Sequence, residues 1–143
     1  MMSTEARGFS LVELLCVMAL VVTLAGLALP SATALLQRVH RSEARLALLQ
    51  VHDAQQRHLA QHHRYASILG AGPAGQALGL PAHSPSGRYG LQLQVPANGE
   101  GYRIEARPTP RGSQASDRGC ALLWLDDLGR QGSEGSPPTD CWR

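Results

Sequence analysis

The feature that most constrains this chain is an apolar segment near the N-terminus with a single carboxylate at its start. No charged residue lies between Leu14 and Leu29, and Glu13 stands immediately before this stretch. From Phe9 to Leu29 the segment has 21 residues, about 31 Å as a helix, which is one bilayer crossing. An acid in hydrocarbon is costly, so it is by default a functional residue that pairs with a cation. We therefore predict a membrane-spanning helix over residues 9–30.

A cation for Glu13 becomes available if the chain is cut between Gly8 and Phe9. The new α-amine of Phe9 then lies four residues from Glu13, about one helical turn away. The same amine on a neighbouring copy could also reach this carboxylate. Residues 1–8 are polar, carry one arginine and are too short to fold, so we interpret them as a removable leader. This arrangement suits a subunit that assembles into a filament.

A second cleavage pattern competes with this interpretation. Ala32-Thr33-Ala34 follows the apolar segment as in an ordinary secretory signal peptide. That alternative leaves Glu13 inside the apolar segment without a role. The N-terminal residue of the mature protein distinguishes the two hypotheses.

The sequence Gly-Phe-Ser-Leu-Val-Glu-Leu-Leu at residues 8–15 resembles the processing site of type IV pilins and type II secretion pseudopilins. In that family a membrane peptidase cuts after the glycine, here Gly8, and the exposed Phe9 is N-methylated. The glutamate at the fifth mature position, here Glu13, is needed for assembly. The resemblance implies four kinds of partner: the prepilin peptidase and methyltransferase, the inner-membrane assembly machinery, the lipid bilayer before assembly, and other pilin subunits through the N-terminal helix.

The resemblance also implies a bacterial inner-membrane protein with one span and a periplasmic C-terminal domain, which later becomes part of an extracellular pilus. A count of positive charges does not agree, because one arginine precedes the span and three follow it closely. We favour the pilin orientation because a pair of cysteines near the C-terminus suits an oxidising compartment. Within the span, Gly26 and Pro30 predict a helix kink, since Pro30 leaves the carbonyl of Gly26 without its usual donor.

Residues 31–64 are predicted to continue the helix as an amphipathic second half. Arg38, Arg41, Arg45 and His52 fall on one narrow stripe. We interpret the stripe first as solvent-facing and second as a partner contact. Apolar residues cover most of the remaining circumference, which predicts a helix with its own sheet on one side and neighbouring subunits on another. These residues are Leu35, Leu36, Val39, Leu46, Leu49 and Val51.

The C-terminal half predicts a small antiparallel sheet. Residues 65–87 are rich in Gly, Ala and Pro and are predicted to be the loop between helix and sheet. Alternating segments predict strands from Tyr89 to Val95, from Tyr102 to Ala106 and from Cys120 to Leu125 within residues 88–143. Residues 98–101 and 126–129 are predicted turns, and residues 107–119 a polar loop. The fold class is thus α+β, and the element order is that of a pilin.

Three cysteines have different predicted roles. Cys16 lies in the apolar segment and is interpreted as a packing residue. Cys120 and Cys141 are predicted to pair, because the pilin resemblance implies export. The loop they close, residues 120–141, is worth roughly 3 kcal/mol in the chain-entropy model. Two free thiols, or half of a metal site, remain the alternatives.

No catalytic constellation is present in the sequence, so we expect neither an enzyme nor a cofactor. His58 and His62 have the i, i+4 spacing of metal ligands but lack an evident third ligand, and we predict no metal site. Asp126 and Asp127 suit calcium, although adjacent turn acids are usually solvated. After Gln37 there are 12 arginines and 9 acidic residues, which is a mild net charge of +3.

The predicted function is therefore that of a minor or accessory type IV pilus subunit, located in the pilus or at its tip. The ending, with Cys120 followed by Cys141-Trp142, resembles minor pilins grouped with the competence pilin, whose members include receptors for DNA uptake sequences. One alternative is thus a DNA receptor that uses Arg107, Arg111 and Arg118, with steep salt dependence. Another alternative is a type II secretion pseudopilin, which the C-terminal cysteine loop disfavours.

Overall fold

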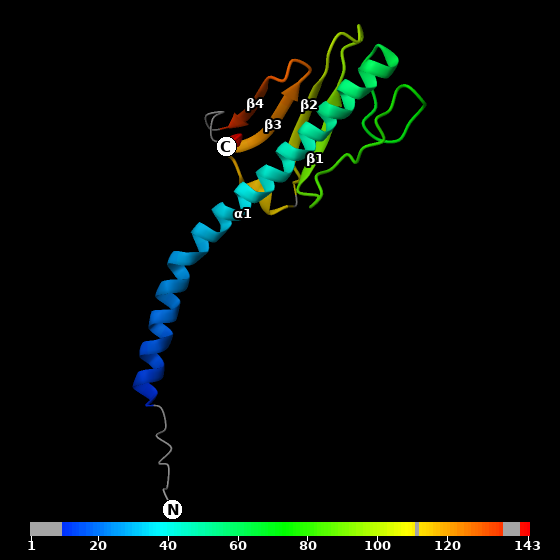
Figure 1. The fold of residues 1–143 in the computed structure, drawn as a ribbon. Helices are drawn as coiled ribbons and strands as arrows, with labels where there is room; N and C mark the ends of the chain where they lie inside the picture. Colours follow the sequence, from blue (N-terminus) through cyan, green and yellow to red (C-terminus); the bar gives the residue numbers. More distant parts are fainter. Residues whose placement is uncertain (1–9, 111, 136–140) are drawn as a thin grey trace, which may run out of the picture. The chain divides into compact units, whose positions relative to one another are not determined.

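The structure, a computed structural model, describes residues 10–110, 112–135 and 141–143, without the side chains of residues 27–31. One long helix, α1 (Leu11–His62), precedes a four-stranded antiparallel sheet in the order β1-β2-β3-β4 (Figure 1). The strands are β1 (Tyr89–Gln94), β2 (Arg103–Pro108), β3 (Cys120–Asp126) and β4 (Gln131–Gly135), with a short 3₁₀ helix, η1 (Ser113–Ser116), before β3. The predicted α+β class is confirmed.

The chain divides into two units, Met1–Leu36 and Gln37–Arg143. In the first unit, α1 begins with an acid in its first turn, Glu13, and the backbone amide of Leu14 donates to the carbonyl of Ser10 at 3.1 Å. Large apolar side chains of this part are mostly exposed, from Leu11 at 74% to Val17 at 48%. The helix runs through Gly26 without interruption, and the predicted kink at Gly26 and Pro30 stays a prediction.

Over the residues that the structure describes, no helix combines the length and the apolar character needed to cross a membrane. The predicted span over residues 9–30 includes Phe9 and the side chains of residues 27–30, which lie outside the described residues. The span therefore stays a prediction.

The second unit is built on a helix face of small and medium apolar residues. Ala44, Leu48 and Val51 are at most 1% exposed and belong to one buried cluster with residues of the sheet. The sheet contributes residues that alternate along each strand, with Ile104 and Ala106 from β2 packed beside Leu123 and Leu125 from β3. One face of the sheet is thus covered by α1 (Figure 1).

The C-terminal segment closes the domain. Cys120 at the start of β3 and Cys141 form a disulfide, as predicted, with their Cα atoms 5.7 Å apart. The indole Nε1 of Trp142 donates to the carbonyl of Gly132 at 2.8 Å, and the carbonyl of Trp142 accepts from the guanidinium of Arg45. The last residues of the chain are thus bound both to β4 and to α1.

Only part of the arginine stripe on α1 faces solvent as interpreted: Arg38 is exposed, whereas the other three members contact the domain. Arg41 pairs with the buried Asp117, and Arg45 binds the carbonyl of Trp142. His52 lies 2.6 Å from the hydroxyl of Tyr102. Large apolar residues of this half of α1 are exposed as well, of which Leu46 is 61% and Leu49 is 49% exposed. The long cations reach over the small residues of the core face to partners in the domain.

The strands also differ from the prediction in two respects. Arg107 and Pro108 belong to β2 rather than to the following loop, because Tyr89 pairs with Pro108 in the register of β1 and β2. Strand β4 has the sequence Gln-Gly-Ser-Glu-Gly, which lacks the β-branched residues and alternation of a strand. It pairs antiparallel with β3, and the indole of Trp124 on β3 lies against it: a Cβ at Gly132 would stand 2.4 Å from Cζ2 of Trp124.

Substitution Gly132→Ala is expected to lower the free energy of unfolding by about 1 to 3 kcal/mol, since Trp124 or β4 must shift. The measurement is a urea titration of the purified protein. Gly90→Ala in β1 is the matched control, because the nearest atom to its added Cβ is the carbonyl oxygen of Arg107 at 4.0 Å. Equal costs at the two glycines would contradict the packing described for Trp124.

Candidate functional site

The first candidate site is the start of α1. Gly8 and Phe9, the predicted cleavage and methylation positions, lie outside the described residues. Glu13 is exposed in the first turn, where the positive end of the helix dipole favours a carboxylate. Its neighbours Val12 and Leu14 are 67% and 61% exposed. An acid is therefore presented to the surroundings among apolar side chains, which suits pairing with a cation when this surface is covered.

The second candidate site is a group of arginines on the outer face of β2. Glu105 is 5% exposed, and each of its carboxylate oxygens takes one arginine. Nε of Arg103 lies 3.0 Å from Oε1, and Nη2 of Arg107 lies 2.9 Å from Oε2. The guanidinium of Arg103 also lies 4.3 Å from the ring centroid of Trp124 on β3. Two cations share one acid here, so this cluster carries a net positive charge.

The predicted DNA contacts are only partly brought together. Arg107 lies on β2 and Arg118 is exposed just before β3, whereas Arg111 lies outside the described residues. Sequence reasoning missed Arg88, whose guanidinium donates to the hydroxyl of Ser113 and whose carbonyl accepts from the amide of Thr109 at 2.9 Å. Its place directly before the first alternating strand was the available signal. We call Arg88, Arg103, Arg107 and Arg118 together the arginine surface. Arg88 extends it from β2 toward the loop before β3.

This loop is fixed to α1 through a buried acid. The carboxylate of Asp117 accepts two hydrogen bonds from Arg41, at 2.6 and 2.7 Å, and one from Nε2 of Gln114 at 2.7 Å. Asp117 is 5% exposed and its charge is balanced by Arg41. The negative charge of Asp117 therefore does not neutralise the positive charge of the exposed Arg118. Among the described residues of this loop, Arg118 is thus an exposed cation that Asp117 does not pair with.

Tyr89 lies beside this network at the start of β1 and is fully buried. Burial, with a smaller contribution from the negative charge of Asp117, raises the pKa of Tyr89 to about 12. Burial likewise raises the pKa of Tyr102 above its usual range. Both phenols are therefore neutral in the folded domain at physiological pH.

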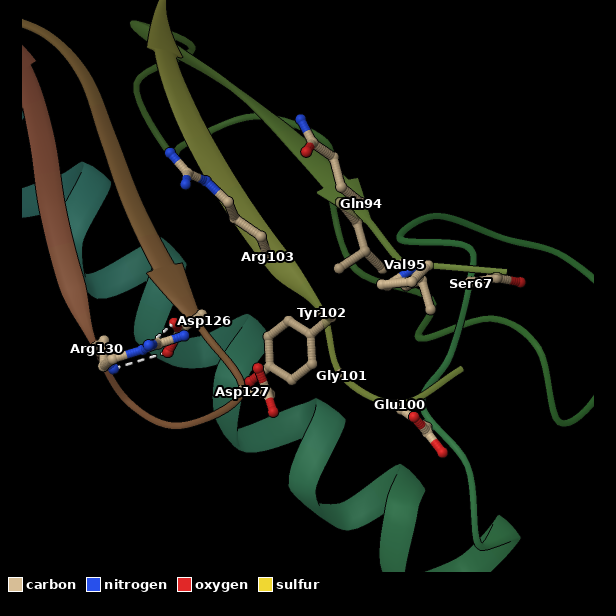
Figure 2. A pocket seen from close by; sticks show the side chains of 12 residues that line it. Ser67, Gln94, Val95, Glu100, Gly101, Tyr102, Arg103, Asp126, Asp127 and Arg130 are labelled. Atoms are coloured by element: carbon tan, nitrogen blue, oxygen red, sulfur yellow. Dashed lines mark hydrogen bonds and ion pairs between the residues drawn. The ribbon is translucent and has the colours of Figure 1, made fainter. Parts of the chain in front are cut away.

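The predicted turn acids line a hollow of about 700 Å³ at the other end of the sheet (Figure 2). Asp126 is paired with Arg130 at 2.7 Å, and it also accepts from the backbone amides of Leu128 and Arg130. Burial alone would raise the pKa of Asp126, but these hydrogen bonds with Arg130 and Leu128 lower it below its usual value. The carboxylate of Asp127 packs against Gly101. Asp126 therefore closes the turn.

The histidines do not build a metal centre within the described part of the chain. The rings of His58 and His62 lie 4.4 Å apart and tilted, and Nδ1 of His58 is 2.9 Å from the carbonyl of Arg64. In the ranges that the structure describes, no group of three His, Cys, Asp or Glu residues is placed to hold a metal ion.

Comparison with solved structures identifies the class of fold. A type IV pilin from Shewanella oneidensis matches with a TM-score of 0.52 and 22% identity, covering 75% of this chain and 98% of that one. The non-core minor pilin PilV of Neisseria meningitidis matches with a TM-score of 0.53 and 19% identity, covering 70% of this chain and 88% of that one. The fold is that of a type IV pilin.

Comparison with family models is more specific. Residues 4–29 match the prokaryotic N-terminal methylation motif, and residues 30–124 match the family described as "Type IV minor pilin ComP, DNA uptake sequence receptor". The chain belongs to this family of type IV minor pilins. A comparison with curated proteins gave no match. The family is one of structural pilins, and the chain is accordingly a pilus subunit.

The buried tyrosines predict a loss of stability at high pH. The unfolded state releases the Tyr89 proton near pH 10 and the folded state near pH 12, so this stabilisation is complete below pH 10 and declines as the pH rises to 12. The expected decline is up to about 3 kcal/mol. Urea titrations at pH 9 and pH 11.5 measure it. The Tyr89→Phe variant, which has no proton to release here, is expected to lose less, and an equal loss in both proteins would contradict the assignment.

Proposed function

We propose that this chain is a minor subunit of a type IV pilus that matures by cleavage between Gly8 and Phe9 and by N-methylation of Phe9. The observation that carries the proposal is the order of the two family matches, because a methylation motif over residues 4–29 leads directly into a minor pilin domain from residue 30. The membrane peptidase and methyltransferase and the inner-membrane assembly machinery are the partners that this maturation requires.

The proposed location follows the same sequence of events. The precursor is anchored in the inner membrane by residues 9–30, with its domain in the periplasm, and then leaves the bilayer for the pilus. The Cys120–Cys141 disulfide supports a periplasmic domain, because disulfides persist in oxidising compartments. In the pilus, the α-amine of Phe9 from the same or a neighbouring subunit neutralises Glu13.

The composition of the chain provides a direct test of maturation. All 13 basic residues are arginine, so after cleavage the α-amine is the only primary amine in the protein. Mass spectrometry of the purified protein is expected to find a chain that begins at a methylated Phe9. A mature chain that begins after Ala34 would instead establish the signal-peptide alternative.

Substitution Glu13→Gln is expected to lower the amount of this subunit in sheared pili by about tenfold or more, because the α-amine then loses its counter-ion in an apolar setting. Cleavage is expected to continue. The matched control is Asp53→Asn, which removes an exposed acid of α1 that pairs with the exposed Arg57 four residues on. Immunoblots of sheared pili and of membranes measure both forms. Normal incorporation of the Glu13→Gln protein would refute the proposed role of this acid.

A second candidate function is reception of DNA. The specific observation in its favour is the arginine surface of β2 and the following loop, where Glu105 is shared by two arginines and Asp117 is already paired. The family name, a DNA uptake sequence receptor, supports the same hypothesis. Arg88, Arg107 and Arg118 are the residues of the described chain that we propose to contact phosphate.

Replacing Arg107 and Arg118 together by Gln is expected to weaken DNA binding and to lower the slope of log K against log salt by roughly 0.9 for each phosphate that an arginine no longer neutralises. Gel retardation of duplex DNA by the purified protein at several salt concentrations measures this slope. Arg57→Gln, which removes an exposed arginine of α1, is the control and should leave the slope unchanged. An absence of retardation at low salt would remove the DNA function, whereas an unchanged slope would remove only the proposed roles of Arg107 and Arg118.

A further inference from the structure

Arg103 on β2 is held by two contacts that fix the plane of its guanidinium. Its Nε is buried and lies 3.0 Å from Oε1 of Glu105. The guanidinium also lies over the indole of Trp124, 4.3 Å from the ring centroid. The indole in turn packs on Gly132, where an added Cβ would clash with the ring. Arg103 is therefore a cation with a defined direction, although its side chain is 39% exposed.

Arg107 lies four residues further along the same strand and shares the same acid. Its Nη2 donates to Oε2 of Glu105, and its side chain is 53% exposed. Among the residues that the structure describes, Nη1 and Nη2 of Arg103 have no hydrogen-bond partner. These two groups form a fork that matches a pair of adjacent acceptors. One buried carboxylate thus holds two arginines, and Arg103 is the more firmly fixed of the two.

Arg103 is flanked by amide side chains on the outer face of the sheet. It pairs in register with Gln94 on β1, and Glu105 pairs with Gln92. Both glutamines are exposed, and Figure 2 shows the side chains of Gln94 and Arg103 on the same side of the sheet. An amide both donates and accepts hydrogen bonds. This part of the arginine surface therefore offers directed hydrogen bonds as well as positive charge.

The width of this face fits the major groove of duplex DNA. Neighbouring strands lie about 4.8 Å apart, so the three strands from β1 to β3 span about 10 Å. The major groove is ~12 Å wide, and sheets are among the elements that enter it. A guanine presents O6 and N7 there, which are the acceptor pair that the fork of a guanidinium binds.

We propose that Arg103 reads a guanine through O6 and N7, while Arg107 contacts a phosphate of the same duplex. A phosphate contact carries no sequence information, whereas discrimination between bases requires a guanidinium that is held in one plane. Glu105 is then a positioning residue, because it fixes the direction of Arg103. The inference rests on the proposed reception of DNA and adds to it a residue that determines which sequence is bound.

The test compares two pools of duplexes that differ only at N7 of guanine. Random-sequence duplexes are enriched for binding to the full-length protein in a nonionic detergent, and the enriched pool is copied with 7-deazaguanine in place of guanine. Charge, length and base pairing are the same in both pools. Gel retardation is expected to show about tenfold tighter binding of the guanine pool, within the range for one bidentate base contact.

Arg103→Gln and Arg107→Gln form a matched pair, because each removes one positive charge from β2 and leaves Glu105 with one arginine. Arg103→Gln is expected to make the two pools bind equally and to leave the slope of log K against log salt unchanged. Arg107→Gln is expected to keep the difference between the pools and to lower the slope by roughly 0.9. The unfolding midpoint and the intact disulfide report whether each variant is folded.

Glu105→Gln separates positioning from charge. This variant raises the net positive charge of the arginine surface, so a purely electrostatic surface would bind both pools more tightly and by the same factor. If Glu105 positions Arg103, the preference for the guanine pool is expected to fall although the positive charge has risen. An unchanged preference would overturn the role of Glu105.

Three results would overturn the reading of guanine by Arg103. The first is equal binding of both pools by the unsubstituted protein, a measurement that depends on no variant. The second is the same loss of slope with Arg103→Gln as with Arg107→Gln, which would place Arg103 on phosphate. The third is an equal weakening of both pools by Arg103→Gln at an unchanged slope, which would indicate stacking of a base. If no duplex is retained even at low salt, the proposed DNA function itself fails, and the inference fails with it.

Discussion

The packing of α1 on the sheet depends on the small side chains of its inner face. Ala44 and Ala47 are at most 4% exposed, and they allow Leu48 and Val51 to reach the layer formed by β2 and β3. The same packing places α1 beside the loop and the C-terminal segment. Arg41 then pairs with Asp117, and Arg45 donates to the carbonyl of Trp142. Leu46 and Leu49 are left on the outside of the helix.

Local patterns predicted most of the fold. The apolar segment and its amphipathic continuation predicted α1, and alternation predicted β1 and β3 nearly to the residue. The pilin resemblance predicted the Cys120–Cys141 disulfide. Strand β4 was not predicted, because its own residues lack strand character, whereas its pairing with β3 and the indole of Trp124 beside Gly132 are contacts with the preceding strand. Periodicity shows which residues share a face, but it does not show what that face meets.

The two candidate sites also differ in how much of them the sequence alone indicates. Glu13 stands out in the sequence because it is an acid beside an uncharged apolar segment, and its role in assembly stays a prediction. The arginine surface was not, because its charge depends on which acids are already paired in three dimensions. Glu105 serves two arginines at once, and Asp117 is paired with a residue 76 positions earlier in the chain. A net charge of +3 distributed along the sequence therefore says little about the local field on the folded surface.

The hydrogen bond between Arg45 and the carbonyl of Trp142 joins residues 97 positions apart. During synthesis, α1 leaves the ribosome long before residue 142 has been made. The guanidinium of Arg45 therefore stays solvated until the C-terminal segment has been synthesised and has folded back onto the helix. The helix and the segment that closes the domain over it thus form at different times, although they depend on the same contact.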